Sequence, residues 1–484
     1  MKKYNFLLII ALLFSTACGD EFYELNEDVK NPQQVPGESL FTSAQKNMVD
    51  QMVSTNVNYN VFRLFCQYWT ETTYTDEARY QLVERNIPEQ HWAELFRRTL
   101  KNLDESAKLI LAHEMIPPEE TVKTNKLQII EILTVYTYSV LVESFGNIPY
   151  SEALDIEVLL PEYDDARGTY IHLIERLNTA IDNLDASAGS FGSADNIYFG
   201  DVAAWKKFAN SLKLRMGMTL ADVEPALSKS AVESAVASGV FTSNADNATL
   251  NYLTSPPNTN PLYIDLVASG RNDFVPANTL VDAMNNLEDP RRKYYFDDNI
   301  RDDATGEVIY VGGIYGENNT YSNFTHVTDR IKQPDFGGVI LDYSEVEFLL
   351  AEAVERGYAV GGTAEEHYNK GVTASFQYWG GTEAEAQDYL KNPEVAYTTA
   401  EGKWDQKIGI QLWLALYNRG YAGWLAQRRL DYPILEPHPM AVSGFPVRLT
   451  YPIVEQTLNG GNWRAAADAI GGDVVTTRLF FDVK

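Results

Sequence analysis

The sequence predicts a mainly α-helical protein in which TPR-like helix pairs form a scaffold that carries long irregular loops. Apolar residues recur at spacings of three to four along much of the chain, which is the period of an amphipathic helix. Strand and helix patterns do not alternate, which disfavours a Rossmann or TIM-barrel architecture. Two stretches, 240–275 and 295–342, interrupt the helical rhythm with proline or with glycine, asparagine and tyrosine. Loops of this length in a compact protein are often functional.

The first predicted helix begins near Ser39, because Phe41, Ala44 and Met48 share one face. Comparable patterns follow at about 89–112, 123–145, 168–185, 202–221, 228–238, 276–287, 343–357, 364–377, 405–430 and 462–470. Within the second of these, Leu127–Phe145 is apolar on nearly every side, so we expect a central buried helix there. Gly146 can end this helix because glycine readily takes a positive φ.

Brief turns join some of these helices into pairs, as between 343–357 and 364–377. A pair of this length cannot bury both of its faces without neighbouring pairs, as in a helical repeat. The strict tetratricopeptide consensus is absent, so the pairs are only TPR-like. Inside the second long loop, Val308–Val311 alternates in a way that allows a small strand.

The N-terminus has the layout of a bacterial lipoprotein signal. Lys2 and Lys3 precede an apolar run from Phe6 to Phe14, and Cys18 follows small residues. The apolar run is far shorter than the roughly 20 residues that cross a bilayer, so it is not a permanent span. We therefore expect a signal peptide over 1–17, a lipid on Cys18, a polar tether over 18–38 and a single α-helical domain over 39–484. The alternative is an ordinary secretory signal that contains a cysteine.

Composition narrows the possible partners. A net charge of −28 argues against nucleic acid and against electrostatic membrane binding, which leaves the lipid anchor as the expected membrane contact. With Cys18 assigned to lipid, Cys66 is the only other cysteine, so a disulfide framework is excluded and Cys66 reads as a small buried hydrophobe. The six histidines are scattered and no known catalytic motif stands out. The sequence therefore predicts no metal site, no cofactor and no enzyme activity.

Several arginines are expected to serve the fold rather than a ligand. Arg215, Arg428, Arg429 and Arg448 lie in or beside apolar segments, where they are expected to pair with carboxylates such as Glu352.

A series of strings along the chain resembles the SusD/RagB-like family of outer-membrane lipoproteins, in particular its SusD-like branch. These strings are Asn26–Pro32, Gln67–Asp76, Phe145–Leu154, Trp205–Arg215, Tyr343–Glu352, Trp424–Arg429 and Arg448–Pro452. The resemblance implies a Bacteroidetes protein on the outer face of the outer membrane, where it caps a SusC-like TonB-dependent transporter in nutrient uptake. In that family the delivered ligand is an oligosaccharide or, in the RagB-like branch, a peptide.

A glycan offers apolar C–H faces and a rim of hydroxyl groups, so its site needs exposed aromatic rings flanked by Asn, Asp or Arg. Three segments supply that mixture. The candidate ligand-binding residues are Trp69, Tyr74, Asp76, Arg79 and Tyr80 in the first, Asn272 and Asp273 in the second, and Tyr315, Asn318 and Tyr321 in the third. Trp69 is expected to be buried. Tyr315 and Tyr321 are expected to be exposed and to form a stacking platform, because their loop is rich in glycine and asparagine.

The sequence thus predicts a non-enzymatic cell-surface lipoprotein that binds oligosaccharides and delivers them to the transporter. The same loop chemistry serves peptides, so a peptide-binding RagB-like lipoprotein is one alternative. Paired carboxylates are plentiful, so a surface glycoside hydrolase is another alternative. A third is a lid that the transporter needs for gating and that binds little ligand itself.

Overall fold

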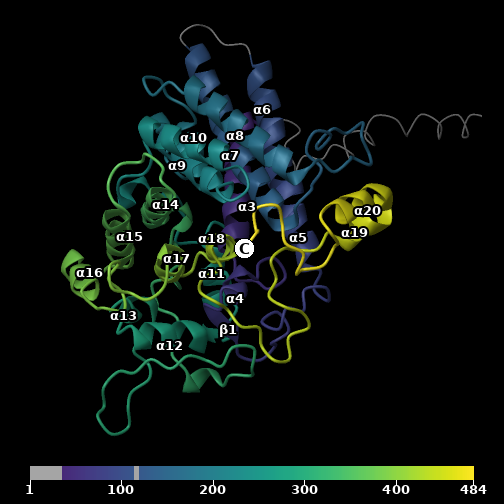
Figure 1. The fold of residues 1–484 in the computed structure, drawn as a ribbon. Coiled ribbons are helices and arrows are strands. Elements are labelled where there is room, and N and C mark those ends of the chain that lie inside the picture. The colour runs from purple at the N-terminus through teal and green to yellow at the C-terminus, as the bar shows by residue number, and fades with distance from the viewer. Residues whose placement is uncertain (1–34, 114–118) are drawn as a thin grey trace, which may run out of the picture.

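The computed structural model describes residues 35–113 and 119–484, which fold mainly into helices (Figure 1). The prediction of a mainly α-helical protein is confirmed. The predicted signal peptide, the lipid site at Cys18 and the tether up to residue 34 lie outside the described residues. Within the part of the chain that is described, no helix is both long enough and apolar enough to cross a membrane.

Helices α6 to α10 gather in the upper part of the molecule in Figure 1. The helices of the first half are α3 (Gly37–Val53), α4 (Phe62–Phe65), α5 (Ile87–Ala93), η1 (Glu94–Leu100), α6 (Lys101–Ala112), α7 (Glu119–Phe145), α8 (Ala166–Asn183), η2 (Gly192–Ala194), α9 (Val202–Thr219) and α10 (Pro225–Ser238). They pack largely as sequential pairs, α7 on α8 and α9 on α10, while α3 packs on α6.

The second half places its helices below and to the side of that bundle. They are η3 (Asn244–Asp246), α11 (Pro261–Tyr263), η4 (Ile264–Ala268), α12 (Asn278–Asn286), α13 (Arg292–Tyr295), η5 (Tyr321–Asn323), α14 (Tyr343–Glu355), α15 (Ala364–Trp379), α16 (Glu383–Tyr389), α17 (Trp404–Ala415), α18 (Gly420–Leu430), α19 (Ile453–Leu458) and α20 (Gly460–Ala469). The predicted pair is α14 on α15. Their close approach requires Gly371, because a Cβ there would lie 2.8 Å from the ring of Phe348.

Helix α7 is the central buried helix that the sequence predicts. Every residue from Val135 to Phe145 is buried. Gly146, at a φ of 88°, follows the last helical residue. The one carboxylate in this buried stretch, Glu143, accepts hydrogen bonds from the hydroxyls of Tyr170 and Tyr421. The charge is therefore not left without partners in the core.

Three predicted elements differ in detail. The expected helix over 405–430 is two helices, because Asn418 takes a φ of 71° between them. Gly420 then starts α18 against the backbone of Arg63, where a Cβ would lie 2.5 Å from the amide nitrogen. The pattern over 89–112 is helical but contains the π-helical turns of η1. The alternation at Val308–Val311 makes only an isolated bridge to Arg301 and no strand.

Two small antiparallel sheets join segments that the sequence leaves mostly as loops. They pair β1 (Trp69–Glu71) with β3 (Phe274–Pro276), and β2 (Ala248–Leu250) with β4 (Gly338–Leu341). The first sheet sets Glu71 opposite Phe274. It therefore joins two segments about 200 residues apart, and these segments carry the candidate site.

Most of the arginines assigned to the fold pair with carboxylates as predicted. Ion pairs join Arg429 to Glu352 (2.9 Å), Arg448 to Asp473 (2.7 Å) and Arg215 to Glu345 (3.9 Å). The prediction that Arg428 pairs with a carboxylate is wrong. Its guanidinium donates to the backbone carbonyls of Glu143 and Val447 and lies 3.5 Å from the ring centre of Trp424.

Cys66 is fully buried, as predicted for a small hydrophobe. Its thiol donates to the carbonyl of Gly420 at 3.1 Å, and burial raises the pKa of the thiol above its ordinary value. The protonated thiol is a poor nucleophile.

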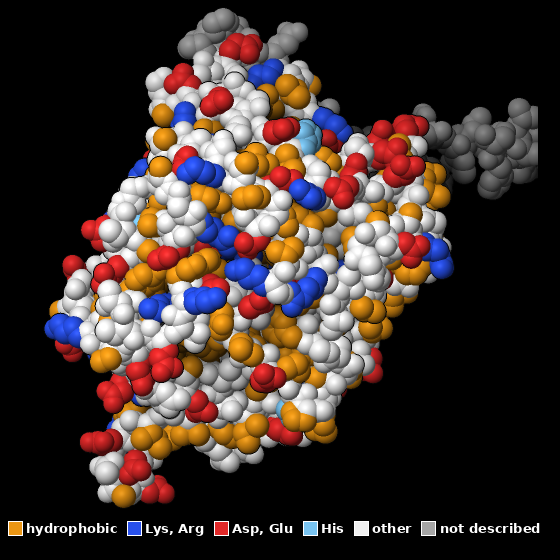
Figure 2. Space-filling view, viewed as in Figure 1, with side chains coloured by type: hydrophobic (Ala, Val, Ile, Leu, Met, Phe, Trp, Pro, Cys, Tyr) orange, Lys and Arg blue, Asp and Glu red, His pale blue; other side chains and the backbone are white. Residues whose placement is uncertain are grey.

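The surface carries the negative charge in dispersed form on the face that Figure 2 shows. Asp and Glu side chains are scattered over that face, with Lys and Arg side chains among them. With a net charge of −28 the protein is well solvated and repels polyanions.

Candidate functional site

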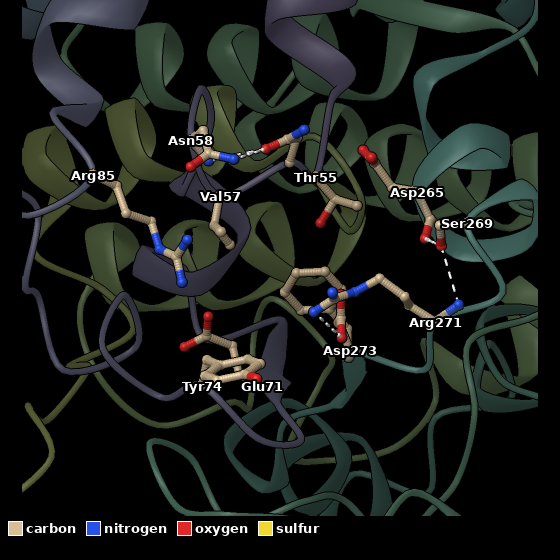
Figure 3. Close-up of a pocket in the computed structure, with 12 residues that line it drawn as sticks. Thr55, Val57, Asn58, Glu71, Tyr74, Arg85, Asp265, Ser269, Arg271 and Asp273 are labelled. Carbon is tan, nitrogen blue, oxygen red and sulfur yellow. Dashed lines mark hydrogen bonds and ion pairs between the residues drawn. The ribbon is translucent and has the colours of Figure 1, made fainter.

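A hollow of about 260 Å³ lies where the turn after α3, the strand β1 and the segment from η4 to β3 meet. Its lining consists of residues 55–58, of Glu71, Tyr74 and Arg85, and of Asp265, Ser269, Arg271, Asp273 and Phe274. Figure 3 shows Arg85 on one side of the opening and Asp265, Ser269 and Arg271 on the other, with Tyr74 and Glu71 below. We call it the β1 hollow.

Strand pairing explains why residues so distant in sequence meet here. Beyond the β1–β3 ladder, the amide of Thr72 donates to the carbonyl of Asp273 at 2.8 Å, and its hydroxyl donates to the carbonyl of Asn272 at 2.7 Å. The amide of Asn319 donates to the carbonyl of Thr72 at 2.9 Å. The three segments that contain the candidate ligand-binding residues therefore converge on β1 and the residues that follow it.

A buried arginine holds the turn at the top of Figure 3 in place. Arg63 is 3% exposed, and its guanidinium donates to the carbonyls of Val53 at 2.8 Å and Ser54 at 2.7 Å. In the turn itself, the side-chain oxygen of Asn56 accepts from the amide of Asn58 at 3.1 Å, which is an Asx turn. The wall over 55–58 is thus fixed before a ligand arrives, which reduces the entropic cost of binding.

Tyr74 and Arg271 present an aromatic face and a fixed cation at the opening. Tyr74 is 59% exposed. Arg271 donates to both carboxylate oxygens of Asp273, at 2.6 and 3.0 Å, which fixes the plane of its guanidinium (Figure 3). An exposed ring beside oriented donors is the combination that the apolar face and the hydroxyl rim of a sugar require.

Two buried glutamates, Glu71 and Glu77, lie in hydrogen-bonding contact at the hollow. Glu71 and Glu77 are 4% and 0% exposed. Burial, together with hydrogen bonding to Glu77, raises the pKa of Glu71 to about 9. Within the described residues, Glu77 Oε2 has no other hydrogen-bond partner, which fits a protonated Glu71 that donates to it. Arg85 forms an ion pair with Glu77 on its other side.

The raised pKa of Glu71 predicts that stability falls as the pH rises. Glu71 keeps its proton in the folded protein up to about pH 9, whereas in the unfolded chain it loses the proton above about pH 4.5. Its contribution is therefore fully present below pH 4.5 and is lost as the pH approaches 9. Glu71→Gln keeps a donor toward Glu77 without titrating, so it should exceed the wild type in unfolding free energy at pH 8 by at least about 1 kcal/mol.

Urea unfolding at pH 5, 6.5 and 8 measures this effect. Glu84→Gln, which changes an exposed carboxylate in the same segment, is the matched control and should follow the wild-type pH dependence. Parallel pH profiles for the wild type and Glu71→Gln would show that Glu71 does not hold the proton.

Asp265 is the remaining carboxylate of the β1 hollow. Burial raises the pKa of Asp265 to about 6, although the backbone amides of Thr55 and Asn56 donate to it and lower the pKa in part. Asp273 is paired with Arg271 and Glu77 with Arg85. In the described part of the chain, Asp265 is therefore the one ionised group lining this hollow that forms no ion pair.

The structure places the predicted ligand residues unevenly around this hollow. Tyr74 and Asp273 line it, and Asn272 stands directly before Asp273 on the exposed side. Trp69 is fully buried, as expected, with its ring centre 6.0 Å from that of Phe274. It supports the hollow from inside and does not reach a ligand.

The expectation that Tyr315 is exposed is wrong. Tyr315 is 6% exposed, and its hydroxyl donates to the carbonyl of Leu64 at 2.8 Å. The loop turns inward because Asn278 accepts the amide of Tyr315 at 3.0 Å and the hydroxyl of Thr70 accepts the amide of Gly316 at 3.0 Å. Tyr315 is therefore unavailable to a surface stacking platform.

The other predicted residues lie away from the lining of the β1 hollow. Tyr321 is half-buried, with its ring stacked 3.8 Å from that of His326. Tyr80 is 2% exposed in the core, and Arg79 donates to the carbonyl of Gly316 at 2.8 Å, which ties two loops together. Asp76 and Asn318 are exposed. These residues shape the loops around the site rather than the hollow itself.

Sequence reasoning missed the turn over 55–58, Arg85, Asp265 and Ser269. A signal existed for the turn, because the asparagine-rich run from Asn56 to Asn60 is typical of turns. Asp265 lies in η4 and Ser269 directly follows it, within the stretch 240–275 that the sequence marks only by its prolines and its length. Over residues 35–113 and 119–484, no group of three His, Cys, Asp or Glu side chains is arranged to hold a metal ion.

Known proteins share this fold. A family described as starch-binding and associating with the outer membrane, SusD-like_2, matches residues 29–452. A solved chitin-binding protein is 26% identical, with a TM-score of 0.79 over 93% of this chain and 100% of that chain. A SusD homolog from Bacteroides uniformis ATCC 8492 is 26% identical, with a TM-score of 0.75 over 92% and 99%. A chitin-binding SusD homolog from Flavobacterium johnsoniae is 24% identical, with a TM-score of 0.77 over 93% and 99%. Among curated proteins, no match was found.

Proposed function

Because the chain belongs to the SusD-like family of starch-binding proteins that associate with the outer membrane, we propose that it is a cell-surface lipoprotein that captures oligosaccharides for a SusC-like TonB-dependent transporter. The observation that carries the proposal is the β1 hollow. There the exposed ring of Tyr74 shares the lining with Asn58 on the opposite side and with Arg271, and hydrogen bonds hold the side chains of both residues (Figure 3). A sugar packs its C–H face on such a ring while its hydroxyl groups bond to the polar side chains.

Charge compensation at the hollow favours a neutral glycan over a peptide. The cations Arg85 and Arg271 are each paired with a carboxylate of this chain, and neither is left free to neutralise a ligand. An anionic group, such as the carboxylate of a peptide, would have to break these pairs or bury its own charge, which is costly. The similarity to a chitin-binding protein at 26% identity supports the same ligand class. A peptide remains the alternative that the binding experiment includes.

We propose binding without cleavage. Hydrolysis of a glycosidic bond uses two carboxyl groups that flank it, one as acid and one as nucleophile or base. At the hollow, Glu71 is occupied by Glu77 and by the amide of Ala78, which donates at 3.0 Å. Asp273 is occupied by Arg271. Asp265 is the one lining carboxylate in the described residues that pairs with no other ionisable side chain, and a single carboxylate does not make the pair that hydrolysis uses.

The proposed location rests on Cys18 and on the outer-membrane association of the family. A lipid on Cys18 would hold the domain at the outer membrane, facing the exterior, beside its transporter. Cys18→Ala should therefore abolish incorporation of a labelled fatty acid and release the protein from the membrane fraction. Persistence of the variant in that fraction would contradict the anchor. Failure of a tagged wild-type protein to co-purify any TonB-dependent transporter from detergent-solubilised membranes would contradict the partnership.

Isothermal titration of the protein that starts after Cys18 tests the function directly. The panel contains malto-oligosaccharides, chito-oligosaccharides and mixed peptides, and each mixture is analysed afterwards for cleavage. Saturable binding of an oligosaccharide without cleavage is the expected result. Binding of peptides alone would show that the ligand is a peptide and not an oligosaccharide. Released sugars would indicate a hydrolase. No binding at all would favour the gating lid.

A further inference from the structure

A second hollow adjoins the β1 hollow. It has a volume of about 300 Å³ and lies between α3, η1 and the segment that contains α11. Asn56 and Asp265 line both hollows, so these two residues form the boundary between them, which we call the saddle. We call the second one the α3 hollow.

The α3 hollow combines apolar faces with polar groups. Tyr59, Pro257 and Ile264 contribute apolar surface, and Ile264 is 43% exposed. Thr259, which also lines the hollow, is 3% exposed, and its hydroxyl has no hydrogen-bond partner among the described residues. A buried hydroxyl without a partner is destabilising, and a ligand hydroxyl group could supply the missing bond after a rotation about the Thr259 side chain. This is the chemistry that a sugar ring meets, with a flat apolar face and a hydroxyl rim.

The charges of the α3 hollow are compensated within the protein. Lys46 pairs with Asp50, which also accepts from the hydroxyl of Tyr252 at 2.7 Å. Arg98 pairs with Glu94 at 3.4 Å. Asp265 on the saddle is the exception, as it is for the β1 hollow. The two hollows therefore have the same electrostatic character, which suits an uncharged chain with many hydroxyl groups.

The small volumes of the two hollows indicate that one ligand occupies both. Cavities that bind drug-sized ligands measure about 300–1,000 Å³, so either hollow alone lies at or below the lower limit. We infer that the two hollows are adjoining subsites of one track, on which a neutral oligosaccharide of several sugar units lies across Asn56 and Asp265. This inference rests on the proposed glycan-binding function. It adds that the protein selects chains by length, and it assigns a binding role to Tyr59, Thr259 and Ile264.

Ligand length and site variants together test the inference. The probes are a disaccharide and a hexasaccharide from the chito- series and from the malto- series, titrated in parallel. The double variant Tyr59→Ala with Ile264→Ala removes the apolar surface of the α3 hollow. It should lower the affinity for the hexasaccharide about tenfold and leave that for the disaccharide within about twofold. Leu458→Ala, an exposed aliphatic change on α19, is the matched control, and thermal unfolding verifies that each variant folds.

The outcomes separate this inference from the proposed function. Equal losses for both lengths, or no loss for the hexasaccharide, would overturn the second subsite. If Tyr74→Ala leaves both lengths bound as tightly as by the wild type, the assignment of the β1 hollow fails, and the track fails with it. If no oligosaccharide binds the wild type, the glycan function fails first, and no glycan track remains.

Discussion

Asp289→Ala is expected to lower the free energy of unfolding by about 3–5 kcal/mol, because it leaves a buried arginine without its counter-charge. Asp289 and Arg291 are both 0% exposed, and Arg291 donates to both carboxylate oxygens of Asp289. Burial alone would lower the pKa of Arg291, but Asp289 raises it above its ordinary value. The guanidinium therefore stays charged. In the variant it keeps the neutral side chains of Ser375 and Gln411 at 3.1 and 3.0 Å, and two aromatic rings, those of Phe376 and Tyr389, at 5.1 and 5.5 Å from their centres.

Urea unfolding of Asp289→Ala, compared with Asp388→Ala, measures this effect. Asp388 pairs with Lys391 on the surface, where the two side chains are 83% and 76% exposed. Loss of such an exposed pair costs less than about 1 kcal/mol. A loss for Asp289→Ala no greater than that of the surface variant would show that the buried pair does not stabilise the contacts of α13 with α15 and α17.

Tyr74→Ala is expected to weaken oligosaccharide binding about tenfold or more while leaving the fold intact. The side chain is 59% exposed at the β1 hollow, so little packing is lost when it is removed. Stacking on an aromatic ring is worth about 0.5–1.5 kcal/mol beyond the apolar area that it buries, and each 1.4 kcal/mol is about tenfold in affinity. Tyr74→Phe keeps the ring and should retain most of the affinity.

Tyr321→Ala is the matched control for this variant. It removes the same side chain from a loop residue that does not line the hollow. Titration of the three variants with one oligosaccharide separates the alternatives. If Tyr321→Ala abolishes binding and Tyr74→Ala does not, the ligand occupies the aromatic loop that the sequence favoured.

The helical scaffold was predictable because its signal is periodic and local. The buried stretch of α7, the pairing of α14 with α15 and the ending of α7 at Gly146 all follow from residue types at fixed spacings. The break between α17 and α18 was not predictable in this way. It depends on Asn418 in the left-handed region and on the close approach of Gly420 to Arg63, which is far away in sequence.

The contacts of the buried arginines were also predictable only in part. Pairing of Arg429 with Glu352 was predictable, since both lie on apolar helical segments that can bury a charge only with a partner. The role of Arg428 was not, because its partners are backbone carbonyls and the ring of Trp424. Backbone carbonyls leave no mark in the sequence.

The candidate site was only partly predictable, because it forms where distant segments pair. Composition pointed to Tyr74 and Asp273, and the β1–β3 ladder joins them. It also pointed to Tyr315, whose burial depends on hydrogen bonds to Asn278 and Leu64. The turn over 55–58 and Asp265 belong to the hollow only through tertiary contacts. Loop aromatics in a sequence therefore identify candidates, while pairing and burial select among them.

A crystal structure of the protein with the oligosaccharide that binds most tightly in the titrations would test the central claim most directly. The account predicts a sugar ring stacked on Tyr74 in the β1 hollow, with its hydroxyl groups within hydrogen-bonding distance of Asn58, Asp265 or Arg271. A sugar bound instead against Tyr321 and Asn318, with the β1 hollow containing only solvent, would contradict it.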